Sequence, residues 1–240
     1  MRDLRDVWSY LSASPLIHLT LTLVAYQIGL AVYRRTKLNP LFNPVLLSVV
    51  LIVTVLVATG TRYETYFDGA QFVHFLLGPA TVALAIPLYR QFEKVRRSAF
   101  AILASTVVGS LTGTVSAVTI GWLLGGSRDS LISRAPKSVT APVAMGITER
   151  LGGLPSLTAV LVILTGILGA MMGTHILNAL GVKDWSARGL AMGTASHGIG
   201  TARALQVNEV AGAFSGLAMG INALATAALL PLLWRWLVAE

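Results

Sequence analysis

The 240 residues are 55% apolar and only 12% charged, and the mean hydropathy is +0.72. This charged share is about half that of soluble domains, so the composition excludes an ordinary soluble protein. The net charge of +8 does not indicate nucleic-acid binding, because Lys and Arg lie in short gaps between apolar runs rather than in one basic cluster. The sequence contains no cysteine, which excludes disulfides and thiolate metal sites.

Apolar runs long enough for membrane helices, which need about 20 residues each, follow one another along the chain. They cover residues 15–33, 41–59, 69–89, 99–124, 131–148, 154–180, 187–205 and 212–238. The third, fifth and seventh runs are more polar or contain Pro and Gly. We therefore predict an all-α, polytopic integral membrane protein: one transmembrane domain over residues 1–240, with about seven or eight segments.

Basic residues between these runs indicate an orientation. The gap after the first run contains Arg34, Arg35 and Lys37, and the gap after the third contains Arg90, Lys94, Arg96 and Arg97. Two crossings separate these gaps, so both lie on the same side of the membrane. The positive-inside rule assigns that side to the cytoplasm.

Pro and Gly interrupt the three weaker runs. Pro79 and Pro87 lie in the first of them. Pro136 and Pro142 lie in the second, on either side of residues 138–140, and residues 193–201 of the third contain several poor helix formers. Non-helical backbone persists at membrane depth only where it is buried in protein or lines a wet cavity. We therefore expect broken or re-entrant helices around a binding site.

A weak internal repeat relates residues 15–124 to residues 131–238. A shift of 115 residues places Pro40 on Pro155 and Gly78 on Gly193. Internal repeats are typical of secondary transporters, whose sites lie where the repeats meet. If every segment crosses the membrane the repeats are parallel, and if each unit has one re-entrant segment they are inverted.

The first candidate site is the run Lys137-Ser138-Val139-Thr140-Ala141-Pro142. Pro142 in the first turn of a half-helix leaves neighbouring N–H groups pointing at the break. Together with Lys137, Ser138 and Thr140, these donors favour binding of a carboxylate. The alternative is an ordinary loop with a hydroxyl cap.

The second candidate site is the Gly-rich break that follows residue 195. Its candidate binding residues are Ser196, His197, Gly198, Gly200, Thr201 and Arg203. Glycine lets the backbone unwind, the hydroxyl groups can bind substrate, and histidine can carry a proton near neutral pH. A single buried histidine is also typical of a hydrogen-bonded core residue.

Two ionisable residues near this break have alternative interpretations. Arg203 can neutralise a substrate carboxylate or anchor the helix end at the interface. Glu209 can pair with Arg203, or it can be a solvated loop acid. Glu209 and His197 are also the two candidates for proton coupling. Six other polar residues can line a transport pathway, but each alone is more typical of contacts between helices: His18, Gln27, His74, His175, Asn178 and Asn222.

Signatures of enzymes are absent from the sequence. It has no His-Glu-x-x-His, no P-loop, no G-x-S-x-G and no paired intramembrane Asp. We therefore expect no enzymatic activity, no metal and no cofactor.

The motifs resemble those of the LrgB/CidB family of bacterial membrane proteins, over a range from about Leu38 to Leu232. The resemblance rests on residues 137–142, 152–159 and 197–204, and on Asn208-Glu209 and the stretch from residue 212 to 219. It implies a multi-pass protein of the bacterial inner membrane. It also implies either antiholin-like control of murein hydrolase export and lysis, or transport of glycolate, glycerate or pyruvate. Members often act with a second, LrgA/CidA-type membrane protein.

The leading hypothesis is a proton-linked, alternating-access carrier of small 2-hydroxy or 2-oxo monocarboxylates. The second is an antiholin-like interaction protein, and a channel is a third, which would need a continuous polar stripe. Small-xxx-small spacings such as Gly169/Gly173 permit close helix packing within one subunit or in a dimer. A homodimer is the expected oligomer.

Overall fold

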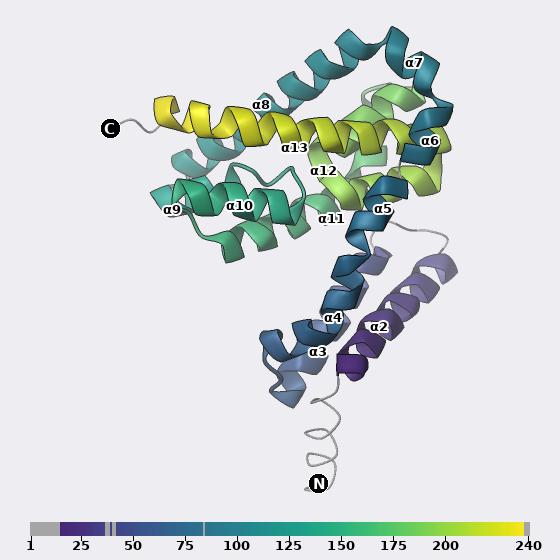
Figure 1. The fold of residues 1–240 in the computed structure, drawn as a ribbon, viewed down its shortest axis with the longest axis vertical. Coiled ribbons are helices and arrows are strands. Elements are labelled where there is room, and N and C mark those ends of the chain that lie inside the picture. The colour runs from purple at the N-terminus through teal and green to yellow at the C-terminus, as the bar shows by residue number, and fades with distance from the viewer. Residues whose placement is uncertain (1–14, 37–38, 40–41, 84, 238–240) are drawn as a thin grey trace, which may run out of the picture. The chain divides into compact units, whose positions relative to one another are not determined.

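A computed structural model gives the structure of residues 15–36, 39, 42–83 and 85–237, in which every regular element is a helix (Figure 1). The helices are α2 (Pro15–Arg35), α3 (Pro44–Thr59), α4 (Tyr63–Phe75), α5 (Leu77–Ala83), α6 (Ala85–Arg90), α7 (Phe92–Arg97), α8 (Ala99–Leu123), α9 (Arg128–Arg134), α10 (Ala141–Leu151), α11 (Pro155–Ala179), α12 (Trp185–Val207) and α13 (Glu209–Leu237). The predicted boundaries Leu38, Leu41 and Val238 lie outside the described residues.

Five helical stretches of the described chain are long and apolar enough to cross a membrane. They are Pro15–Arg35, Tyr63–Arg90, Ala99–Leu123, Pro155–Ala179 and Glu209–Trp234. Large apolar side chains on them face outward, including Phe100 at 85% exposed, as expected for a surface in contact with lipid. The chain is thus a multi-pass membrane protein, and the predicted seven or eight segments exceed the five stretches that meet these criteria.

Contacts divide the chain into two compact units, Met1–Ala83 and Leu84–Glu240. In the first unit α2 packs against α3 and α4. The Thr22 hydroxyl lies 2.9 Å from the Tyr66 hydroxyl, which joins α2 to α4. The side chain of Asn43 accepts two backbone N–H groups and caps the start of α3. The second unit contains both candidate sites.

In the second unit, α12 enters and leaves the bundle at the same end. Asp184, just before α12, lies 3.7 Å from Lys94, and Glu209, just after α12, lies 2.8 Å from Arg90. Arg90 and Lys94 are only four residues apart, at the end of the unit that contains α7. The helix reverses at His197, whose φ of 41° and ψ of −134° are not helical. We call residues 185–207 the α12 hairpin.

Close packing confirms that the two arms of the α12 hairpin run in opposite directions along α13. Gly189 and Gly193 of the first arm press against the backbone carbonyls of Ala211 and Ser215, respectively. Residue numbers therefore increase in the same direction along the first arm and along α13, so the two run parallel. In the second arm the order is reversed, because Thr201 contacts Ser215 while Gly212 packs against Leu205. A Cβ atom at either glycine of the first arm would overlap the facing carbonyl.

α9 and α10 form a second hairpin from the opposite end of the unit. Residues 135–140 are not helical, and α10 begins again at Ala141. Ala135 of one arm packs with Ile147 of the other, beside Leu230 of α13. The Thr158 hydroxyl of α11 lies 2.9 Å from both the Ser133 carbonyl and the Thr148 hydroxyl. We call residues 128–151 the α9–α10 hairpin.

The tips of the two hairpins lie at the middle of the long helices around them. Ser138 of the α9–α10 hairpin faces Gly113 of α8, and His197 of the α12 hairpin contacts Val162 and Gly166 of α11. Of the three interruptions expected, the structure therefore shows those at residues 136–142 and 193–201. The third run, residues 69–89, is divided among α4, α5 and α6. The repeat of residues 15–124 and 131–238 stays a prediction.

Candidate functional site

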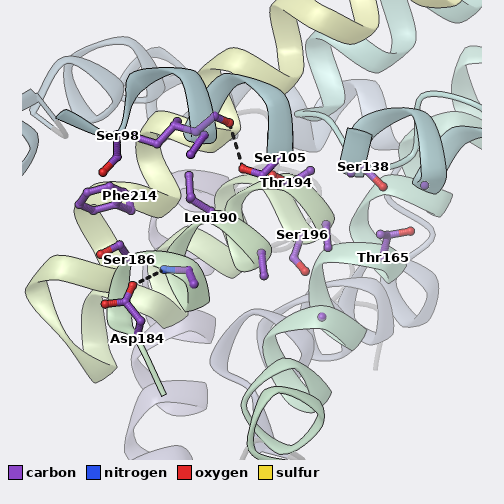
Figure 2. Close-up of a pocket in the computed structure, with 18 of the residues that line it drawn as sticks. Ser98, Ser105, Ser138, Thr165, Asp184, Ser186, Leu190, Thr194, Ser196 and Phe214 are labelled. Carbon is purple, nitrogen blue, oxygen red and sulfur yellow. Dashed lines mark hydrogen bonds between the residues drawn. The ribbon is translucent and has the colours of Figure 1, made fainter. Parts of the chain in front are cut away.

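A cavity of about 910 Å³ extends through the second unit from the α7 end to the hairpin tips. Figure 2 shows Ser98, Asp184, Ser186 and Phe214 at one end of it and Ser138 and Thr165 at the other. Its walls come from α7, α8, α11, α13, the first arm of the α12 hairpin and the tip of the α9–α10 hairpin. Cavities of this size hold small organic ligands in other proteins.

The tip end of the cavity brings together three of the predicted binding residues, Lys137, Ser138 and Ser196. Lys137 is half-buried, and its ammonium group lies 3.4 Å from the Ser138 hydroxyl. None of the ion pairs found in the described residues includes Lys137. A partly buried cation without a carboxylate partner favours binding of an anion.

The exposed end of the cavity contains an ion pair between Lys94 and Asp184. The Lys94 ammonium also lies 5.5 Å from the centre of the Phe214 ring, in a cation–π arrangement. The Asp184 side chain caps the α12 hairpin by accepting the Ala187 N–H at 2.9 Å. This hydrogen bond, aided by the charge of Lys94, holds the pKa of Asp184 below its usual value.

His197 is the turning point of the α12 hairpin. It is the only described residue other than glycine with a positive φ, in a region that costs other residues about 1–3 kcal/mol. The side chain is 4% exposed, and its Nε2–H donates to the Val162 carbonyl at 2.9 Å. His197 therefore fixes the tip to α11 rather than lining the cavity.

Several predicted residues lie near the cavity without lining it. Thr201 is buried, donates to the His197 carbonyl at 2.8 Å and contacts the Ser215 hydroxyl. Gly200 lets the two arms of the α12 hairpin approach, and a Cβ atom on Gly198 would make only an ordinary contact with Met219. Thr140 is the N-cap position of α10 but makes no cap with its side chain, and the exposed Pro142 follows it.

Arg203 and Glu209 lie elsewhere. Arg203 lines a small separate pocket that also contains Trp185 and Arg188. Glu209 pairs with Arg90 at 2.8 Å, and both partners are more than half exposed. An exposed pair of this kind contributes little to stability.

The sequence did not predict the Lys94–Asp184 pair or the partners of Asn222. Lys94 and Asp184 are 90 positions apart in the sequence. Each lies among other charged loop residues, and nothing in either loop indicates that the two residues pair. Asn222 is 1% exposed and hydrogen-bonds both hairpins. A single amide in an apolar helix was the only available signal, and it is typical of many helix contacts.

Comparison with known proteins identifies the family. The profile of the LrgB-like family matches residues 22–236. The chain belongs to this family. No solved structure matches it.

Curated relatives of this LrgB-like protein cover most of its length. "Uncharacterized protein YxaC" of Bacillus subtilis is 38% identical over 87% of this chain and 90% of its own. "Holin-like protein CidB" of Staphylococcus epidermidis is 34% identical over 93% of this chain and 96% of its own. "Antiholin-like protein LrgB" of Bacillus mycoides is 32% identical over 91% of this chain and 95% of its own.

Proposed function

We propose that this LrgB-like protein is a carrier of small monocarboxylates of the glycolate, glycerate, lactate or pyruvate class. The supporting observation is Lys137, a half-buried cation at the tip end of a cavity, without an ion-pair partner in the described residues. A carboxylate beside Lys137 compensates its charge. The hydroxyls of Ser138 and Ser196 can bind the 2-hydroxy or 2-oxo group of the same substrate.

The proposed carrier works by alternating access and moves a proton with each anion. Carrying a proton and a monocarboxylate together transfers no net charge, so the membrane potential does not oppose uptake. The α7 end, with its basic residues, is the proposed cytoplasmic end in the bacterial inner membrane. His197 and Glu209 are the proposed proton-coupling residues.

The test is uptake of labelled glycolate, lactate and pyruvate by proteoliposomes, with a pH gradient in either direction. Lys137→Gln should lower uptake at least about tenfold, because the bound carboxylate loses its charged partner. Lys183→Gln, which removes an exposed lysine that does not line the cavity, should leave uptake unchanged. Absence of saturable uptake of all three acids by the unaltered protein would exclude the carrier.

The second candidate function is antiholin-like or holin-like control of murein hydrolase export and cell lysis. The names of the relatives favour this function over carboxylate transport. Its proposed partners are a second copy of this chain and an LrgA/CidA-type membrane protein. Under this function Ser138→Ala should leave control of lysis intact in a cell-lysis assay, whereas a carrier should lose transport in this variant.

A further inference from the structure

Asn222, at the middle of α13, hydrogen-bonds both hairpins with one amide nitrogen. Its Nδ2 lies 3.1 Å from the Ser138 carbonyl oxygen and 2.9 Å from the Thr194 carbonyl oxygen. Ser138 belongs to the tip of the α9–α10 hairpin, and Thr194 lies three residues before the turn of the α12 hairpin. A single buried side chain therefore bridges two segments that enter from opposite ends of the unit.

The chemistry of these partners fixes which way the amide faces. Carbonyl oxygens only accept hydrogen bonds, so both must face the NH₂ group, which has two hydrogens. The amide oxygen faces the Thr226 hydroxyl at 3.4 Å, and Thr226 lies 2.9 Å from the Ser110 hydroxyl of α8. This polar chain is buried, so water cannot replace a lost donor without entering the bundle.

The bridge determines the spacing of the tips. Because both carbonyl oxygens bond the same nitrogen, they lie no more than about 6 Å apart. The backbones of Ser138 and Thr194, two residues that line the cavity, are therefore held close to each other. Asn222 itself does not line the cavity.

We infer that Asn222 is a positioning residue that holds the two hairpin tips at the spacing required for substrate binding. This inference rests on the proposed carrier function and adds the residue that assembles its site. Asn222 acts through the backbone of the tips and does not touch the carboxylate. Its loss should let the tips separate and weaken substrate binding before it affects the overall fold.

The test uses disulfide cross-linking, which is clean because the chain has no natural cysteine. A Cβ atom built on Gly109 lies 3.9 Å from the Thr194 Cβ, within the range of about 3.5–4.5 Å for a disulfide. A Cβ atom on Gly113 lies 3.6 Å from the Ser138 hydroxyl oxygen. The pair Gly109→Cys and Thr194→Cys thus reports the distance of the α12 hairpin from α8. The pair Gly113→Cys and Ser138→Cys reports the distance of the α9–α10 hairpin from α8.

Oxidation is followed in native membranes by labelling the remaining thiols, so the measurement requires neither purification nor substrate. Asn222→Leu keeps the side-chain shape and removes both donors. It should slow cross-linking of at least one pair about tenfold, because a buried carbonyl and a partly buried one lose the donor that they share. Thr226→Val is the matched control on the same helix. It removes the contacts of Thr226 with the Asn222 amide oxygen and the Ser110 hydroxyl, and neither of these involves a hairpin, so it should change the rate by less than about twofold.

Transport is then measured for the same variants without the added cysteines. The expected result is a raised KM for carboxylate uptake with Asn222→Leu and a near-normal KM with Thr226→Val. Unchanged cross-linking with Asn222→Leu, or equal slowing with Thr226→Val, would overturn the positioning role. If the unaltered protein transports no carboxylate, the carrier proposal fails. Cross-linking that is slower with Asn222→Leu but not with Thr226→Val would still establish that Asn222 sets the spacing of the tips.

Discussion

Lys94 and Asp184 face each other at the exposed end of the cavity, with Nζ 3.7 Å from Oδ2. Asp184 has two roles there, because it also caps the first turn of the α12 hairpin through the Ala187 N–H. One carboxylate thus connects the start of a re-entrant helix to α7. Both roles can be separated by substitution.

Replacing Asp184 by alanine should destabilise the protein more than replacing it by asparagine. Asparagine keeps a capping oxygen, whereas alanine removes it at a cost of about 1 kcal/mol. The exposed ion pair adds little to either difference. Thermal unfolding of both variants in detergent measures the effect, and equal losses in the two would contradict a capping role.

The stability contributed by the Asp184 charge should depend on pH. Its pKa is lower in the folded protein than in the unfolded chain, so the ionised group stabilises the fold at neutral pH. This contribution is lost as the pH falls through the lowered value. The stability difference between the unaltered protein and Asp184→Asn should therefore shrink below about pH 4. A difference that grows on acidification would show that the sign is wrong.

At position 197, glycine should be tolerated better than alanine. Both substitutions remove the bond to the Val162 carbonyl, but only alanine remains strained at a φ of 41°. The strain is worth about 1–3 kcal/mol, so His197→Gly should have the higher unfolding temperature. Comparison of the two melting curves checks this, and the reverse order would indicate that the turn is not at His197.

Gly193→Ala should prevent normal packing of the α12 hairpin, whereas Gly198→Ala should not. A Cβ at Gly193 overlaps the Ser215 backbone carbonyl, which cannot move without α13. A Cβ at Gly198 meets only the Met219 sulfur at 3.9 Å. The yield of monodisperse protein in size-exclusion chromatography distinguishes them. Normal yield from Gly193→Ala would mean that the arm does not pack as described.

The sequence was sufficient to predict helical membrane segments and the interruptions at residues 136–142 and 193–201. Pro136, Pro142 and the dense glycines act locally, since they remove donors or helix propensity wherever the chain places them. The same reasoning identified Lys137, Ser138 and Ser196, which line the cavity. These residues lie at the interruptions themselves, so their location followed from the local pattern.

The remaining placements depend on tertiary structure. Arg203 and Glu209 follow the break closely in sequence, but the second arm of the hairpin carries them back to the α7 end, where Glu209 meets Arg90. The role of Asn222 depends on two carbonyls that lie 84 and 28 positions away along the chain. No local pattern encodes such partners, because backbone carbonyls look the same in every sequence.

Because α12 returns to the end of the bundle where it starts, the loops before and after it lie on the same side of the membrane. This changes the membrane topology that is deduced from counting hydrophobic segments. Reporters fused near residue 183 and near residue 208 should signal the same aqueous compartment. Counting residues 187–205 as a full passage instead assigns them to opposite compartments and reverses the deduced location of everything downstream, including the carboxyl terminus. Tags, antibodies and protease sites planned from a count with this one error would then be placed on the wrong side of the membrane.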